Sequence, residues 1–326
     1  MAKALITGSS GFIGSHLVSA LIEKGWQVSA LIREATDTGW LEKQQVNLIK
    51  SDYSDKKSLE KAVRGIEYVF HLATVIYGDD WQPFYKANVQ ATENLLAACS
   101  DVNPGLKKFI YVSSIAASGP SEKGRLKDEE DECRPTSLYG KSKLAAEEVV
   151  RAYGSRIPFV ILRPPNVLGI RQEELKTLLL TLKKGISPRL GNGDRQTTIC
   201  FVEDVVRSLI LVAEADAATG QTYFVTDNDT HSWRDMIDTA SRLMGKRFVL
   251  KIPFPLVYVT ALVSEGLSRV FGVKKLVNLI DIVDSRKRYW LFKSEKIHRE
   301  LGFSPHITFE EGITTIIGHY RKEGIL

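Results

Sequence analysis

Cysteine and methionine are scarce in this chain, with three of each among 326 residues. The cysteines Cys99, Cys133 and Cys200 are odd in number and far apart, which argues against a disulfide framework and against the paired spacings of a metal site. We therefore expect no metal and a reducing, cytoplasmic compartment. The chain also lacks an apolar run of about 18 residues, the length that spans a membrane. Because the first strand begins at residue 3, no signal peptide is expected.

The chain also lacks a strong excess of charge of either sign, because its 44 basic and 39 acidic residues leave a net charge of +5. The basic residues are dispersed, which argues against a nucleic-acid partner. The hydrophobic share of 44% and the charged share of 25% are ordinary for a globular protein, and the length allows one or two domains. The acidic run 128–132 is expected to form a solvated loop.

Glycines near the start of the chain form the first functional motif. The apolar run Lys3–Thr7 is typical of a parallel strand buried on both faces, and residues 12–24 repeat apolar side chains at helical spacing. Gly8 lies at the turn between them. A glycine-rich loop between a strand and a helix is the context in which a dinucleotide binds.

Each glycine of this loop has a physical task. Gly8 allows the tight turn, Gly11 lets the backbone approach a pyrophosphate, and Gly14 lets the helix pack against the strand. The N–H groups at the start of the helix, at Phe12 and Ile13, would then donate to the phosphates. The alternative is a glycine-rich turn that binds nothing.

Strand and helix signals alternate through the first half of the chain. The expected strands are Gln27–Ile32, Val46–Ser51, Tyr68–Ala73, Lys108–Ser113 and Phe159–Arg163. The expected helices are Lys56–Val63, Pro83–Ser100 and Tyr139–Tyr153. This order predicts an α/β fold, a Rossmann-type doubly wound parallel sheet with right-handed crossovers.

The pattern changes after the pair Pro164-Pro165. Helices are expected at about 173–184 and 205–214, a strand near Thr222–Thr226, and mostly helix toward the C-terminus. We predict an NAD(P)-binding Rossmann domain at 1–165, to which segments of 196–226 return, and a smaller, mostly helical substrate lobe at 166–326.

Arg33, directly after the second strand, informs the choice of cofactor. An acidic residue there would bind the ribose 2′-hydroxyl of NAD, whereas an arginine pairs with a 2′-phosphate. Arg33 thus favours NADP(H), with NAD(H) as the alternative. The interpretation of Arg33 as a solvent-facing arginine without a ligand also stays open.

Asp52 and Tyr53 close the third strand as further cofactor candidates. Asp52 is placed to accept from the adenine amino group or, equally, to cap the next helix, for which Asp55 is better placed.

A phenol and an ammonium lie one helical turn apart at Tyr139 and Lys143. The pKa of a free phenol is about 10, and nearby cations lower it. With Lys143 and a nicotinamide cation beside it, Tyr139 is a candidate general acid and base. Ser114 ends the strand 110–114 and is placed to hydrogen-bond a reacting oxygen. The spacing Tyr-x-x-x-Lys is common by chance, and its position after a strand ending in Ser-Ser gives it weight.

With these motifs the chain resembles the extended short-chain dehydrogenase/reductase family, also called NAD-dependent epimerases/dehydratases, over essentially its whole length. Further matching segments are His71–Ala73, Asn88–Asn94, Leu162–Pro164, Phe201–Val205 and Leu301–Phe303. The resemblance implies that Tyr139 is the catalytic acid/base, Lys143 its pKa partner and Ser114 the residue that orients the carbonyl.

The same resemblance implies further cofactor contacts. Leu72, Ala73 and Thr74 would line the cofactor near its ribose and nicotinamide, and Pro164 and Val167 would flank the nicotinamide. For Asn88 two roles stay open, ordering the segment behind the active site or ordinary helix capping.

Departures from the family pattern narrow the activity. The chain has Ser114-Ile115-Ala116 where the dehydratase branch has Thr-Asp-Glu, so sugar dehydration is not expected. Thr197 stands where nucleotide-sugar epimerases carry an arginine, although Arg195 is close by and Asn166 keeps that option open. The stretch 105–120 resembles the 3β-hydroxysteroid dehydrogenase and dihydroflavonol reductase branch.

Apolar segments follow Pro253, at 256–263 and in the stripe 276–283, with basic residues at 274–275 and 286–288. These segments are interpreted as the core of the lobe. The alternatives are an apolar substrate pocket or a peripheral membrane face.

The sequence therefore predicts an NADP(H)-preferring enzyme that interconverts a secondary alcohol and a ketone on a hydrophobic small molecule. A homodimer is expected, joined through the helices 83–100 and 139–153. One alternative is a nucleotide-sugar 4-epimerase with tightly bound NAD. An alternative of another class is a non-catalytic dinucleotide-binding sensor, against which the complete set of Ser114, Tyr139 and Lys143 argues.

Overall fold

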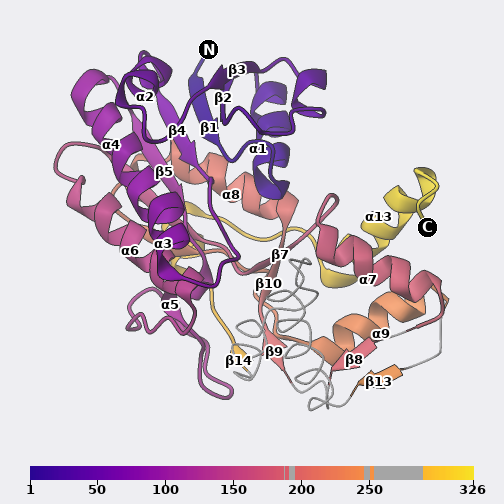
Figure 1. Cartoon of the computed structure of the whole chain (residues 1–326). Helices are drawn as coiled ribbons and strands as arrows, with labels where there is room; N and C mark the ends of the chain where they lie inside the picture. The colour runs from indigo at the N-terminus through magenta and orange to yellow at the C-terminus, as the bar shows by residue number, and fades with distance from the viewer. Residues whose placement is uncertain (187, 191–194, 246–249, 253–288) are drawn as a thin grey trace.

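Alternating strands and helices fill the first half of the computed structural model (Figure 1), which describes residues 1–186, 188–190, 195–245, 250–252 and 289–326. The strands of this half are β1 (Lys3–Thr7), β2 (Gln27–Ile32), β3 (Asn47–Lys50), β4 (Tyr68–His71), β5 (Lys108–Val112) and β6 (Phe159–Arg163). The helices are α1 (Phe12–Glu23), η1 (Leu41–Lys43), α2 (Lys56–Val63), α3 (Trp81–Phe84), η2 (Tyr85–Gln90), α4 (Ala91–Val102), α5 (Ile115–Ser118) and α6 (Leu138–Ala152).

These strands form one parallel sheet in the order β11-β6-β5-β4-β1-β2-β3, to which β11 (Thr222–Phe224) adds the seventh strand. The order reverses beside β1, as in a Rossmann-type doubly wound fold, so the predicted fold class is confirmed. The strands are apolar throughout because alternate residues enter different cores: Ile6 joins the cluster beneath α1, and Leu5 joins the cluster beneath α4.

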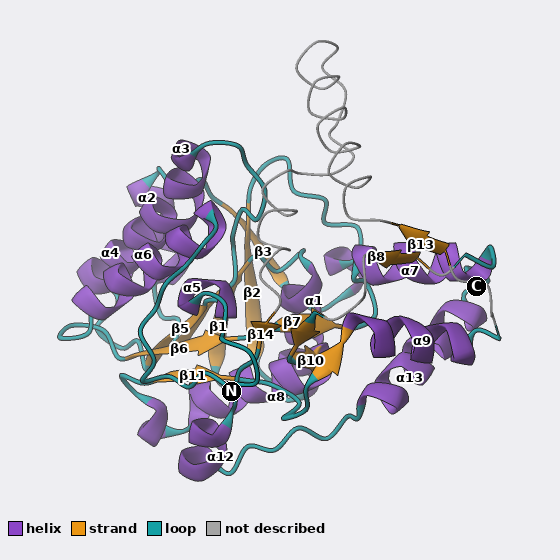
Figure 2. Ribbon diagram, turned by 90° about the horizontal axis from the view of Figure 1, so that it is seen from below, coloured by secondary structure: helices purple, strands orange, loops and turns teal. Residues whose placement is uncertain are grey.

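Helices cover both faces of this sheet (Figure 2). The helices α1 and α8 (Val202–Glu214) pack on one face through residues such as Leu17 and Leu209. The helices α2, α4 and α6 pack on the other face through residues such as Leu59, Leu95 and Val150. The two layers bury the sheet from both sides, as its composition predicts.

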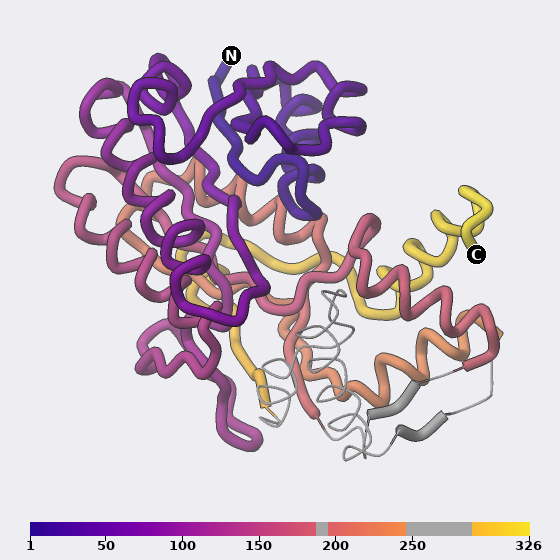
Figure 3. The backbone as a smooth tube through the Cα atoms, viewed as in Figure 1, coloured from indigo at the N-terminus to yellow at the C-terminus, as the bar shows by residue number. Residues whose placement is uncertain are grey.

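The second half of the chain supplies a smaller body built around α7 (Glu173–Lys183), α9 (Trp233–Leu243) and α13 (Phe309–Lys322), which share a core that includes Leu179 and Ile316. The remaining elements are β7 (Asn166–Leu168), β8 (Pro188–Leu190), β9 (Gln196–Thr197), β10 (Ile199–Phe201), η3 (Asp216–Ala218), β12 (His231–Ser232), β13 (Leu250–Ile252), β14 (Tyr289–Trp290) and α12 (Glu295–Leu301). Figure 3 shows the chain crossing between the two bodies more than once, because α8, β11 and α12 return to the main sheet before α13 leaves it.

Two sequence-based expectations need correction. The single helix expected over Pro83–Ser100 is three consecutive segments, in which the π-helical turn η2 separates α3 from α4. The acidic run 128–132 is a loop, but it is not simply solvated. Glu129 is half-buried and accepts a hydrogen bond from the backbone N–H of Phe224 (2.7 Å), and Asp131 pairs with Arg125.

The apolar segments expected at 256–263 and 276–283 lie outside the described residues, as do the basic residues at 274–275 and 286–288. Within the described part of the chain, no helix combines the length and the apolar character needed to cross a membrane. The same residues contain no cluster of three or more metal-ligating side chains.

Candidate active site

The predicted site residues gather at one edge of the main sheet. Because all its strands are parallel, their carboxyl ends lie at the same edge. The glycine loop follows β1, Leu72–Thr74 follows β4, Ser113-Ser114 follows β5, and Pro164 follows β6. Residues that are far apart in the sequence are thus brought to one edge of the sheet.

The glycine loop is packed so tightly that side chains would not fit. Gly8 has a φ of +68°, and a Cβ on it would lie 2.7 Å from the backbone nitrogen of Ala73. A Cβ on Gly14 would lie 2.1 Å from the carbonyl oxygen of Gly8. The N-cap of α1, Gly11, offers no side-chain cap, so the first N–H groups of the helix stay available to an anion. The buried hydroxyl of Ser9 in the same loop also lacks a partner among the described residues. This cradle fits a dinucleotide pyrophosphate.

Phe12 and Ile13, the other predicted residues of this loop, are partly buried against the core beneath α1. Pro164 and Val167 are buried as well. The carbonyl of Pro164 accepts from the N–H of Ile115 (3.1 Å), which fixes the chain after β6 against the chain after β5.

A one-directional chain of hydrogen bonds runs behind the site through His71. The Thr7 hydroxyl accepts from the N–H groups of Leu72 (3.2 Å) and Ala73 (3.1 Å), so its proton goes to Nδ1 of His71 (2.7 Å). Nε2–H of His71 in turn donates to the Thr92 hydroxyl (2.9 Å), which donates to the carbonyl of Asn88 (2.6 Å). Burial, helped by the charge of Lys143, lowers the pKa of His71 to about 3. His71 is therefore a neutral bridge between β1, β4 and α4.

Asn88 clamps the segment that carries Thr74. Its Oδ1 accepts from the N–H of Val75 (2.7 Å) and from the Thr74 hydroxyl (3.1 Å), while its Nδ2 donates to the carbonyl of Val75 (2.9 Å) and to the Ser142 hydroxyl (2.8 Å). Asn88 lies inside η2 and caps no helix. Of the two roles left open by the sequence, the geometry therefore matches the ordering one.

Tyr139 is partly buried beside Ser114 and Thr74. Burial raises the pKa of Tyr139 to about 12, and hydrogen bonding with these two hydroxyls lowers it only in part. The sequence predicts that Lys143 and a nicotinamide cation lower this pKa, and that role stays a prediction. The ammonium of Lys143 donates to the carbonyl of Val112 (2.7 Å) and lies 4.4 Å from the ring centre of Tyr111.

Lys143 is itself buried, with 1% of its surface exposed. Burial lowers the pKa of Lys143 to about 7, and the carboxylate of Glu147, one helical turn further along α6, opposes this effect. A buried lysine with a shifted pKa is typical of functional sites.

A buried ion pair fastens α6 to the two strands beside it. Glu147 accepts from Arg163 at both carboxylate oxygens (2.8 and 2.6 Å) and from the hydroxyl of Ser113 (2.6 Å). Glu147 is fully buried and Arg163 nearly so. Because Arg163 ends β6 and Ser113 follows β5, this contact fixes Tyr139 and Lys143 relative to Ser114.

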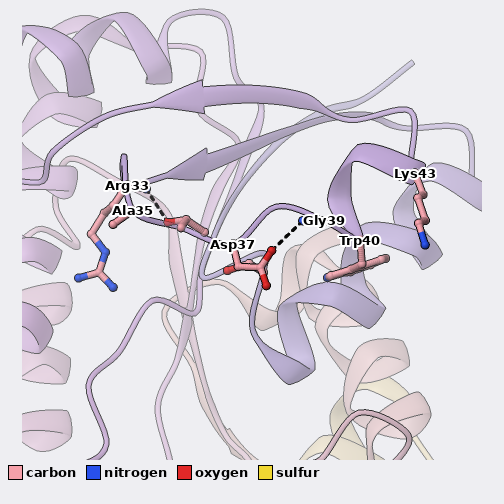
Figure 4. A pocket seen from close by; sticks show the side chains of 8 residues that line it. Arg33, Ala35, Asp37, Gly39, Trp40 and Lys43 are labelled. Atoms are coloured by element: carbon pink, nitrogen blue, oxygen red, sulfur yellow. Dashed lines mark hydrogen bonds between the residues drawn. The ribbon is translucent and has the colours of Figure 1, made fainter.

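Arg33 lines an open pocket of about 530 Å³ at the end of β2. The other lining residues are Ser10, Ala35, Thr36, Asp37, Gly39, Trp40 and Lys43. Figure 4 shows Arg33 and Lys43 at opposite ends, with Asp37 and Trp40 between them. Oδ1 of Asp37 accepts from the N–H of Gly39 (3.0 Å), and the Thr36 hydroxyl accepts from the N–H of Arg33 (3.0 Å). Ser10 and Lys43 are not among the residues predicted from the sequence. Ser10 lies within the predicted glycine loop, whereas residues 34–46 carry no periodic pattern that would place Lys43.

Asp52 and Tyr53 follow β3 in different settings. Asp52 is exposed, and hydrogen bonds from the backbone and hydroxyl of Ser54 lower its pKa; the cap of α2 is Asp55. The side chain of Tyr53 is directed inward beside Thr7 and His71, where burial raises the pKa of Tyr53 to about 12.

Comparison with known proteins agrees with this geometry. The model of the NAD dependent epimerase/dehydratase family matches residues 4–225, and the chain therefore belongs to that family. It is an NAD(P)-dependent oxidoreductase of the extended short-chain dehydrogenase/reductase type.

Three similar proteins illustrate the range of this family. The chain is 27% identical over 322 residues to 4-hydroxy-2-methyl-3-oxo-4-farnesyl-3,4-dihydroquinoline-1-oxide ketoreductase of Stigmatella aurantiaca, covering 96% of this chain and 95% of that protein. It is 26% identical over 343 residues to the decarboxylating sterol-4-alpha-carboxylate 3-dehydrogenase of Mus musculus, covering 98% and 92%. The solved structure of MoeE5 in complex with UDP-glucuronic acid and NAD superposes with a TM-score of 0.78 at 25% identity, covering 99% and 100%.

Proposed function

We propose that the protein is an NADP(H)-preferring dehydrogenase/reductase that interconverts a secondary alcohol and a ketone on a hydrophobic small molecule. The observation that carries this proposal is the placement of Tyr139 beside Ser114, with buried Lys143 one turn away. Burying a lysine is costly, so a fold that keeps one beside a phenol has a use for both.

In this proposal each residue has one task in ketone reduction. The nicotinamide, when bound, supplies the hydride that reduces the carbonyl carbon. Ser114 donates a hydrogen bond to the carbonyl oxygen and orients it. Tyr139 donates its proton to that oxygen, and in the alcohol-oxidising direction it removes the proton again. Lys143 holds a positive charge behind the phenol and stabilises the phenolate that remains.

The glycine cradle supports dinucleotide binding, with Gly8, Gly11 and Gly14 making room for the pyrophosphate and Phe12 and Ile13 supplying N–H groups. Leu72–Thr74, Pro164 and Val167 lie at the same edge of the sheet and would contact the ribose and nicotinamide.

Cations at the pocket after β2 support the preference for NADP(H). Arg33 and Lys43 both line this pocket, and either cation favours the 2′-phosphate that distinguishes NADP(H) from NAD(H). The acidic side chain of Asp37 in the same pocket is held by its own turn. Titration with both cofactors tests the preference, and equal affinities for NADPH and NADH would remove it.

The hydrophobic substrate class is supported by the curated relatives, because one acts on a farnesyl-substituted quinoline and another on a sterol. The runner-up function, a nucleotide-sugar 4-epimerase with tightly bound NAD, is favoured by the likeness to MoeE5. Thr197 argues against it, since this residue is buried and its hydroxyl donates to the carbonyl of Thr198 (3.0 Å) instead of offering a cation to a diphosphate.

A pair of variants tests the catalytic assignment. Tyr139→Phe removes only the titratable hydroxyl and is expected to lower kcat by about 10² to 10⁴ while NADPH binding is retained. Tyr153→Phe removes a phenol at the far end of α6 and serves as the matched control with unchanged kcat. Substantial turnover of a hydrophobic ketone by Tyr139→Phe would refute the role.

A ligand panel tests the substrate class. Hydrophobic ketones are expected to raise the melting temperature in the presence of NADP(H), whereas UDP-sugars are expected to leave it unchanged. Stabilisation by a UDP-sugar alone would favour the epimerase.

A further inference from the structure

Arg171 adopts a backbone conformation that an arginine rarely takes. It lies in the loop between β7 and α7, and its φ is +74°. In the described part of the chain only Asn228 shares this feature among non-glycine residues. Asparagine adopts this region more readily than arginine, so the backbone of Arg171 is strained there. The backbone N–H of Arg171 donates to the hydroxyl of Tyr320 on α13 (3.1 Å), and this hydrogen bond helps to hold the strained conformation. A residue kept in strain is often one whose side chain has a task.

The side chain of Arg171 reaches from the smaller body to the cofactor side of the molecule. Its guanidinium lies 4.1 Å from the ring centre of Trp40. Nη1 donates to the hydroxyl of Ser15 in α1 (2.8 Å), and Ser15 in turn donates to the carbonyl of Phe12 (2.7 Å). The carbonyl of Ile170 accepts from His16 beside it (2.9 Å).

Trp40 is partly buried and packs against the core beneath α1. Its indole N–H is buried without a hydrogen-bond partner among the described residues, so stacking and packing alone hold the ring. Trp40 immediately precedes η1, whose Leu41 is fully buried and whose last residue is Lys43. Both Trp40 and Lys43 line the pocket that contains Arg33 (Figure 4). The position of the Trp40 ring therefore helps to decide where Lys43 is presented.

We propose that Arg171 is a positioning residue for NADP(H): by stacking on Trp40 it fixes the wall of the pocket that presents Lys43 to a 2′-phosphate. The inference rests on the proposed preference for NADP(H). It attributes part of that preference to Arg171, a residue of the smaller body. NADH has no 2′-phosphate, so it does not draw on Lys43. Loss of Arg171 should therefore weaken NADPH binding selectively.

The test compares the dissociation constants of NADPH and NADH in the full-length protein by calorimetry. The variants are Arg171→Gln, Trp40→Leu and the double variant. The matched control is Arg156→Gln, which removes a guanidinium stacked on Tyr153 (4.7 Å), outside the pocket. Arg171→Gln is expected to weaken NADPH binding about 3- to 10-fold and to change NADH binding less than about 2-fold. The control is expected to bind both cofactors as the parent does.

The double variant separates positioning from simple charge. If Arg171 acts through Trp40, the double variant should bind NADPH like Trp40→Leu alone. Independent, multiplicative losses would mean that Arg171 acts by its own charge and would overturn the inference. Equal weakening of NADPH and NADH would overturn it too, because it would indicate a general role at α1.

The cofactor affinities of the parent protein distinguish a failure of this inference from a failure of the proposed preference for NADP(H). If the parent prefers NADPH and Arg171→Gln keeps the same ratio of affinities, the inference alone fails. If the parent binds NADH as tightly as NADPH, the proposed cofactor preference fails and the inference falls with it.

Discussion

His71 is a titratable residue placed where it cannot take up a proton without losing a bond. Its Nδ1 accepts from Thr7, and its Nε2–H donates to Thr92. Protonation would put a hydrogen on Nδ1, and the Thr7 hydroxyl would then have to turn away from it. Burial adds to this cost, which is why the pKa of His71 falls to about 3. The bridge between β1, β4 and α4 thus depends on a neutral imidazole.

The low pKa of His71 predicts acid sensitivity. Between pH 6.5 and about 3 the unfolded chain binds a proton here that the folded protein does not. The free energy of unfolding is therefore expected to fall as the pH falls through this window. His71→Gln, which cannot titrate, should show a shallower loss in urea unfolding between pH 7 and 4. His319→Gln, at a half-buried position of α13, is the control, and a slope of His71→Gln equal to that of the parent would contradict the prediction.

Lys143 gives a pH dependence of the same sign as His71, in a higher pH window. Its pKa is about 7 in the folded protein and about 10.5 when exposed, so the unfolded chain binds the extra proton between these values. Stability is expected to rise with pH from 7 to 10.5, and the full cost of burying the charge is present below pH 7. Lys143→Met should raise the free energy of unfolding at pH 7 by about 1–3 kcal/mol while abolishing turnover. Lower stability of Lys143→Met at pH 7 would show that the contact with Val112 outweighs burial.

At the scale of elements, the placement of α6 depends on a glycine that the Tyr-x-x-x-Lys spacing did not single out. A Cβ on Gly140 would lie 2.3 Å from the carbonyl oxygen of Ala116. The helix that carries Tyr139 can thus approach the segment after Ser114 only because residue 140 has no side chain. This contact brings the phenol and the serine to one place.

Alanine substitutions in two helices test this close approach. Gly140→Ala is expected to destabilise the protein by about 1–3 kcal/mol and to lower activity, because α6 must move. Gly318→Ala in α13, where a Cβ would meet nothing within 4 Å, is expected to stabilise it by about 0.5–1 kcal/mol. Thermal unfolding and kcat of both variants decide the matter; wild-type activity of Gly140→Ala would mean that the approach is not needed.

Local patterns predicted the regular elements well and the interruptions badly. The strands β2 (Gln27–Ile32) and β6 (Phe159–Arg163) could be predicted from their apolar runs, because a parallel strand that is buried on both faces is apolar along its length. The π-turn at Tyr85–Gln90 depends on Asn88 meeting Val75, a contact that only tertiary structure reveals. The same limit applies to Lys43, which the turn at Asp37 and the burial of Leu41 bring to the pocket.

At the scale of the whole molecule, the site lies where three packing arrangements meet: the two faces of the sheet and the smaller body around α7 and α13. The helices α4 and α6 pack side by side on one face, and the outward residues Lys141 and Glu148 are exposed. This surface is the predicted two-fold interface.

The homodimer predicted through α4 and α6 has a simple test. Light scattering at micromolar concentration is expected to give twice the chain mass of 36.4 kDa. Charge reversal by Lys141→Glu together with Glu148→Lys should shift the protein toward monomer, whereas Lys322→Glu on exposed α13 should not. A monomer mass for the parent would contradict the prediction.

The ion pair between Glu147 and Arg163 also affects which parts of the molecule can unfold locally. Separating the pair strands a charge in the core, at a cost of about 3–5 kcal/mol, so α6 and β6 cannot open independently. Tyr139 and Lys143 therefore belong to a cooperative unit whose amide protons should exchange slowly. The segment 33–39, with mostly exposed side chains, can open locally at lower cost than Trp40 and Leu41, which pack against the core. Under the proposed function, the reacting groups would be held rigidly, and the outer end of the cofactor would meet the more open segment 33–39.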